Sequence, residues 1–161
     1  MRVFLKYWLP VLIWLGVIFL GSTDVMSAEQ TSRFLLPFLR WLKPDISSET
    51  FTQIHFLVRK LGHVGEYAIL ALLLWRAVRS IRTLHMKLSM LPGAVLLGCA
   101  LFAASDEFHQ SFVKSRTPSV RDVLLDISGA LIGLLIGMSF AHRHPKKTFS
   151  TTRSQFVDAE L

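Results

Sequence analysis

The sequence has little that would support a disulfide-bonded, zinc-dependent or nucleic-acid-binding protein. Its one cysteine, Cys99, lies within an apolar run and cannot form a disulfide inside the chain, so we expect a small packing residue there. No HExxH or similar zinc spacing occurs, and no nucleic-acid motif accompanies the formal net charge of +7. Ser105, Ser111 and Ser119 lack the local sequence of a nucleophile elbow. The sequence therefore identifies no cofactor and no nucleic-acid partner.

Long apolar runs are what the sequence does contain. Hydrophobic residues make up 52% of the 161 residues, and the mean hydropathy of +0.45 is high for a soluble domain. A run of about 18 apolar residues can cross a bilayer. The runs do not alternate with polar residues, which favours helices over strands. We predict an all-α, polytopic membrane bundle of four transmembrane helices. The four runs are Tyr7–Thr23, Leu61–Ala77, Leu88–Ser105 and Ile127–Ala141.

The first run has a second interpretation. Arg2 and Lys6 precede it, and Ser27 and Ala28 offer a weak cleavage site, as in a secretory signal. The run is long, contains two tryptophans and is followed by further spans. We therefore expect a retained membrane helix.

Residues 31–43 predict a short interfacial helix. Apolar side chains share one face and basic side chains the other, as in helices that lie on a membrane. The faces comprise Phe34, Leu35, Phe38, Leu39 and Leu42 on one side and Arg33, Arg40 and Lys43 on the other. Pro37 weakens this helix, and a plain loop is the alternative. The next helix is predicted from about Glu49 to Arg79, with Ser47 or Ser48 as its N-cap.

Basic residues around the second connection predict the orientation. Arg76, Arg79, Arg82 and Lys87 flank a short loop, which the positive-inside rule places in the cytoplasm. Lysines and arginines that flank membrane spans also face anionic lipid, the expected partner. We predict a multi-pass protein of the cell membrane with both termini cytoplasmic. Its transmembrane domain covers residues 1–142, and residues 143–161 form a polar tail that we expect to be disordered.

Ionisable residues gather at the predicted outer ends of the helices, where they are costly to keep and indicate a site. Spacings of three and four residues place Lys60, His63 and Tyr67 on one stripe of the second helix. The third and fourth helices carry further polar residues at the same level. The complete predicted site is Lys60, His63, Tyr67, Asp106, Glu107, Gln110, Arg116, Asp122 and Asp126.

These residue types allow more than one chemistry. Lys60 and Arg116 could hold an anionic head group. His63 or His109 could act as a base near neutral pH. A divalent metal on the carboxylates and histidines is a less favoured alternative.

Internal ion pairing is a further alternative. Lys60 with Asp106, or Arg116 with Asp122, would then fix only the register of the helices.

A small-residue pattern follows in the fourth run. Gly129, Gly133 and Gly137 recur every four residues, which lets another helix approach closely. This predicts a packing seam and allows a homo-oligomer through the same residues.

Three motifs, in order, resemble the VanZ-like family of membrane proteins. The first is K-x-x-H-x-x-x-Y, the second D-E-x-x-Q-x-F, and the third R-x-x-S-x-x-D-x-x-x-[DN]-x-x-G. They begin at Lys60, Asp106 and Arg116. One departure is Lys114 and Ser115, where the family commonly has Pro-Gly.

The resemblance implies a small multi-helix membrane protein. Some members are associated with low-level resistance to glycopeptide antibiotics, notably teicoplanin, but the family names no reaction. We expect the outer polar site to bind or act on an anionic lipid or a lipid-linked cell-wall precursor. A structural or regulatory membrane protein and a small oligomeric transporter or flippase are the alternatives.

Overall fold

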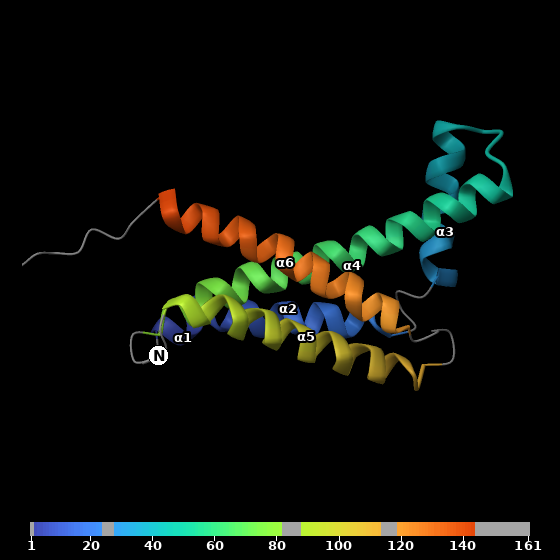
Figure 1. The fold of residues 1–161 in the computed structure, drawn as a ribbon. Helices are drawn as coiled ribbons and strands as arrows, with labels where there is room; N and C mark the ends of the chain where they lie inside the picture. Colours follow the sequence, from blue (N-terminus) through green and yellow to red (C-terminus); the bar gives the residue numbers. More distant parts are fainter. Residues whose placement is uncertain (1, 24–27, 82–87, 114–118, 144–161) are drawn as a thin grey trace, which may run out of the picture.

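The computed structural model describes residues 2–23, 28–81, 88–113 and 119–143, and these residues form helices without any strand (Figure 1). The elements are α1 (Arg2–Tyr7), α2 (Leu9–Gly21), α3 (Ala28–Leu42), α4 (Ser48–Val78), the 3-10 turn η2 (Leu88–Met90), α5 (Leu91–Gln110) and α6 (Val120–Arg143). The predicted all-α class is confirmed.

Four helical stretches in the described part of the chain are long and apolar enough to cross a membrane. They are Phe4–Gly21, which joins α1 to α2, Ser48–Val78, Leu91–Gln110 and Val120–Phe140. The prediction of four membrane helices is therefore confirmed. Helices α5 and α6 extend beyond the third and fourth apolar runs. The acidic residues near the ends of these runs therefore lie within helices and not in loops.

Local signals explain two of the helix starts. Ser47 is the N-cap of α4 as predicted, because its side chain accepts a hydrogen bond from the Thr50 amide at 3.1 Å. Ser119 precedes α6, and its Oγ accepts from the Arg121 amide at 3.2 Å. Helix α4 has 31 residues, which at 1.5 Å per residue give a length of roughly 46 Å. This exceeds the ~30 Å thickness of the hydrocarbon core, so one end of α4 projects beyond the bundle.

The two ends of the bundle differ in what they carry. Figure 1 shows α1, the end of α4, the start of α5 and the end of α6 at one end. The ends of α2 and α5 and the start of α6 lie at the other, which we call the polar end. The predicted cytoplasmic side corresponds to the first of these. Arg82, Lys87 and the predicted tail beyond residue 143 lie outside the described residues.

The glycine seam holds α4 and α6 together. A Cβ atom on Gly129 would lie 2.8 Å from Val64 Cα, and one on Gly133 would lie 2.7 Å from Ala68 Cα. The predicted seam is confirmed, and α4 of the same chain fills it. The homo-oligomer suggested by the same glycines remains a prediction, and it would need another face because α4 covers this one.

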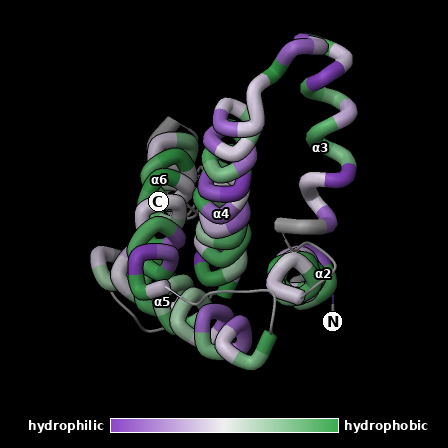
Figure 2. Tube along the Cα trace, turned by 90° about the vertical axis from the view of Figure 1, so that its right-hand side faces the viewer, coloured by the Kyte–Doolittle hydropathy of each residue, from purple (hydrophilic) through white to green (hydrophobic). Residues whose placement is uncertain are grey.

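Helix α3 lies across the bundle axis in both views (Figures 1 and 2). Its apolar residues Phe34 and Trp41 are 80% and 79% exposed. The helix includes Pro37 without ending there. A helix in this segment is confirmed, and the alternative of a plain loop is wrong. Its position on the membrane surface remains a prediction.

The core lies where α4 meets α5 and α6. Tyr67, Leu70, Cys99, Ala103 and Ala130 have no exposed surface. Cys99 is therefore the small packing residue that the sequence predicted. Helix α2 is fixed to this core by a hydrogen bond from its Trp14 Nε1 to the carbonyl of Glu66, at 2.9 Å.

Candidate functional site: a divided polar end

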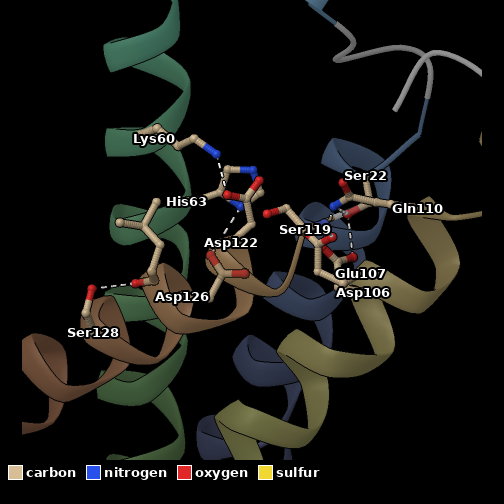
Figure 3. Close-up of polar contacts among 11 residues, drawn as sticks. Ser22, Lys60, His63, Asp106, Glu107, Gln110, Ser119, Asp122, Asp126 and Ser128 are labelled. Atoms are coloured by element: carbon tan, nitrogen blue, oxygen red, sulfur yellow. Dashed lines mark hydrogen bonds and ion pairs between the residues drawn. The ribbon is translucent and has the colours of Figure 1, made fainter. Parts of the chain in front are cut away.

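A histidine and a carboxylate face each other between α4 and α6. His63 Nδ1 lies 3.2 Å from Asp126 Oδ1, and Asp126 has no exposed surface (Figure 3). Because a carboxylate only accepts hydrogen bonds, Nδ1 carries the proton in this contact. The Nε2 atom of His63 is left as an acceptor or, when protonated, as a second donor. This arrangement orients the ring and suits it to bind an anion or take a proton.

One turn toward the polar end, Lys60 Nζ forms an ion pair with Asp122 Oδ1. Their side chains are 27% and 16% exposed. The predicted internal pair of Lys60 with Asp106 is therefore wrong. Asp122 is on α6, the helix that packs most closely on α4, whereas Asp106 is on α5 and turns toward α2.

Asp106 belongs to a second polar group, formed by α2 and α5. Ser22 Oγ donates to Asp106 Oδ1, and Gln110 Nε2 donates to Asp106 Oδ2 at 2.9 Å (Figure 3). Gln110 also reaches Ser22 Oγ at 3.4 Å. Ser22 and Gln110 are 3% and 4% exposed. We call Ser22, Asp106 and Gln110 the polar partition.

Glu107 forms a hydrogen bond that joins the end of α5 to the start of α6. Its Oε2 accepts a hydrogen bond from the Ser119 amide at 2.7 Å, so it anchors the residue that starts α6. The side chain is buried, and its Oε1 has no hydrogen-bond partner among the described residues. Glu107 therefore connects the end of α5 to the start of α6.

The polar partition separates two pockets. The first, which we call the polar pocket, has a volume of about 180 Å³ and lies between α2, α3 and α4. It is lined by Gly21, Ser22, Thr31, Val58, Arg59, Gly62, His63, Glu66 and Gln110. Arg59 supplies a guanidinium, His63 an imidazole and Glu66 a carboxyl group. Ser22 and Gln110 of the partition form part of its wall.

The second, which we call the aromatic pocket, has a volume of about 540 Å³ and lies between α2 and α5. It is lined by Leu15, Gly16, Ile18, Phe19, Tyr67, Phe102, Ser105, Asp106, Phe108, His109 and Phe112. Asp106 of the partition reaches this side. The polar end is therefore divided into a small charged pocket and a larger, mainly apolar one.

The family model described as VanZ/LLP1 matches residues 7–141, most of the chain. The chain belongs to the VanZ/LLP1 family. Neither a curated protein nor a solved structure gave a match. The match covers most of the first membrane helix, the whole of the other three spans and both polar groups, and it names no ligand.

The residues predicted from the sequence have different positions in this VanZ/LLP1 chain. His63 and Gln110 line the polar pocket, and Tyr67 and Asp106 line the aromatic pocket. Four others make contacts between helices: Lys60, Glu107, Asp122 and Asp126. Arg116, and with it the predicted Arg116–Asp122 pair, lies outside the described residues.

The site predicted from the sequence does not include Ser22 or Arg59, both of which line the polar pocket. Ser22 has no motif around it, and its one signal is its position at the polar end of the first membrane helix. Arg59 precedes the first motif by a single residue and lies beside the predicted stripe.

The metal alternative needs a group of metal-ligating side chains. Among the described residues, no three or more His, Cys, Asp or Glu side chains are grouped so as to hold a metal ion.

Proposed function

We propose that the polar pocket binds the phosphate of an anionic membrane lipid at the outer face of the membrane. The observation that carries this proposal is that Arg59 and His63 line the same pocket, with His63 held in place by Asp126. A guanidinium and an imidazolium are strong, charge-assisted donors to phosphate oxygens. Asp126 stabilises the protonated ring, so the ring can donate from Nε2 while Nδ1 stays paired.

The remaining wall limits the charge of the head group. Glu66 and Thr31 line the same pocket, and both already take part in interactions within the chain. A carboxylate in the wall opposes a second negative charge on the ligand. A phosphodiester with a single negative charge, such as that of phosphatidylglycerol, matches this wall.

The volume limits the size of the enclosed group. Pockets for drug-sized ligands commonly have about 300–1,000 Å³, and the polar pocket has about 180 Å³. It suits a phosphate with its nearest substituents, not a whole sugar–peptide head group or a glycopeptide antibiotic. A lipid-linked cell-wall precursor would thus be held through its phosphate, and an association with teicoplanin rests on the family alone.

The contacts of Lys60 and Glu107 indicate that these two residues have a structural role. Lys60 is engaged by Asp122, and Glu107 is engaged by the start of α6. These contacts tie helices together, as in the alternative of internal pairing. We therefore restrict the ligand-binding role to Arg59 and His63 and their neighbours in the polar pocket.

Lipid binding to single-arginine variants tests this proposal. Native mass spectrometry in dodecyl maltoside would measure the Kd for phosphatidylglycerol of the wild type, Arg59→Gln and Arg79→Gln. Loss of one charge-assisted hydrogen bond corresponds to tenfold weaker binding or more. We expect that loss for Arg59→Gln only.

Arg79 is a matched control, because it lies at the other end of α4 with its guanidinium 5.4 Å from the Trp75 ring. Equal affinities for all three proteins would overturn the proposal, and so would an equal loss in both variants.

A further inference from the structure

Tyr67 lies in the aromatic pocket with a hydroxyl that no described residue satisfies. The side chain has no exposed surface, it lines the pocket, and its Oη has no hydrogen-bond partner among the described residues. An unsatisfied polar group inside an apolar region is unfavourable, because it has lost its hydrogen bonds to water without replacing them. A ligand that bonds to this hydroxyl would remove that cost.

A second unsatisfied group lines the same pocket. His109 Nδ1 is buried without a partner among the described residues, and its ring contacts the Phe19 ring in a tilted arrangement, with the centroids 4.6 Å apart. A phenol O–H and an imidazole N–H can both donate. Two residues with unused donors line one pocket, which indicates a ligand that carries an acceptor.

The charge of the ligand is restricted by Asp106. Both of its oxygens already accept hydrogen bonds, from Ser22 and Gln110, and the carboxylate lines the pocket. An anionic acceptor beside it would be repelled. Because the remaining wall is largely aromatic and aliphatic, the ligand is an apolar chain that bears a neutral acceptor.

We propose that the aromatic pocket is a second lipid site, which takes the ester-linked acyl chain of a glycerolipid with the ester carbonyl bonded to Tyr67 Oη. An ester carbonyl attached to a hydrocarbon chain is the neutral acceptor that this surface fits. An isoprenoid chain or an alkyl ether lacks the carbonyl. The polar partition keeps this site separate from the polar pocket, so the inference stands independently of the proposed phosphate site.

The number of tyrosines allows a site-specific test. The chain has two, Tyr67 and Tyr7, so incorporation of 3-fluorotyrosine gives two fluorine resonances in NMR spectra, and Tyr7→Phe assigns them. Tyr7 lies at the opposite end, with Lys6 Nζ 5.4 Å from its ring. It therefore serves as the internal control. Dodecyl maltoside, which has no ester group, is the detergent.

Two lipids that differ only in their linkage are then titrated: diacyl phosphatidylcholine and its dialkyl ether analogue. We expect the diacyl lipid to move the Tyr67 resonance in a saturable way and the ether analogue to leave it in place, while the Tyr7 resonance stays unchanged with both. Equal shifts with the two lipids would show contact with the chain alone and overturn the ester assignment. No shift with either would overturn the site.

The same titration in Arg59→Gln separates the two proposals. The ester-specific Tyr67 shift is expected to persist in this variant, even where phosphatidylglycerol binding is lost. Disappearance of the shift would mean that one lipid occupies both pockets and would overturn the assignment of a separate site.

Discussion

His63 and Asp126 meet across a close contact between α4 and α6, with Nδ1 and Oδ1 3.2 Å apart. The residue after His63 is Val64, whose Cα would lie 2.8 Å from a Cβ atom on Gly129. The absence of a side chain at Gly129 therefore lets the two backbones approach at the level of this pair. The glycine seam and the histidine–carboxylate contact are two parts of one arrangement.

The first prediction is that His63 and Asp126 are energetically coupled. A double-mutant cycle of His63→Ala and Asp126→Ala should give a coupling free energy of about 1–2 kcal/mol, above the ~0.6 kcal/mol average for hydrogen bonds between membrane helices. The reason is that Asp126 is fully buried and its acceptor is a carboxylate. Unfolding in mixed SDS micelles, followed by circular dichroism, measures it.

The control cycle pairs Asp126→Ala with His55→Ala. His55 lies two turns away on α4 and stacks on Phe51, with the ring centroids 5.7 Å apart. Its coupling to Asp126 should be close to zero. A zero value for the His63 cycle as well would contradict the assigned contact.

The second prediction concerns the seam. Gly133→Ala should lower the free energy of unfolding by about 1–3 kcal/mol, the usual cost of overpacking, because its Cβ would lie 2.7 Å from Ala68 Cα. Gly93→Ala is the matched control, since nothing lies within 4 Å of a Cβ there. Chemical unfolding of both variants measures the difference, and equal stability of the two would refute the close packing.

The third prediction concerns the start of α6. Glu107→Ala removes the acceptor for the Ser119 amide, a hydrogen bond to a charged group of about 1.5–3 kcal/mol. Hydrogen–deuterium exchange at Ser119 should therefore accelerate about tenfold or more. Glu49→Ala, in the first turn of α4, should leave that exchange unchanged. Unaltered exchange in Glu107→Ala would show that Glu107 does not anchor α6.

The sequence predicted the membrane helices and the level of the polar residues, because hydrophobic length and helical periodicity are local properties. It did not predict which residues form ion pairs or hydrogen bonds with each charged side chain. Lys60 pairs with Asp122 and not with Asp106, since the glycine seam turns α6 toward α4 while Asp106 faces Ser22. The identity of each partner depends on the orientation of every helix about its own axis, which the sequence pattern of one helix does not fix. The division into two pockets follows from the same rotations and has no sequence signal.

The fourth prediction tests the orientation that the basic loop indicates. Ser111→Cys at the polar end should react with a membrane-impermeant maleimide on intact cells. Ser89→Cys at the opposite end should react only after permeabilisation. Both positions are exposed, and the native Cys99 has no exposed surface and should not react. The reverse labelling pattern would place the polar end in the cytoplasm.

A structure with bound lipid tests the central claim most directly. Crystals grown from a lipidic mesophase doped with phosphatidylglycerol would show where the lipid phosphate lies. We predict a phosphate in the polar pocket, within hydrogen-bonding distance of the Arg59 guanidinium and of His63 Nε2, with His63 Nδ1 still on Asp126. A polar pocket without phosphate, in crystals where ordered lipid phosphates lie elsewhere on the protein, would contradict it.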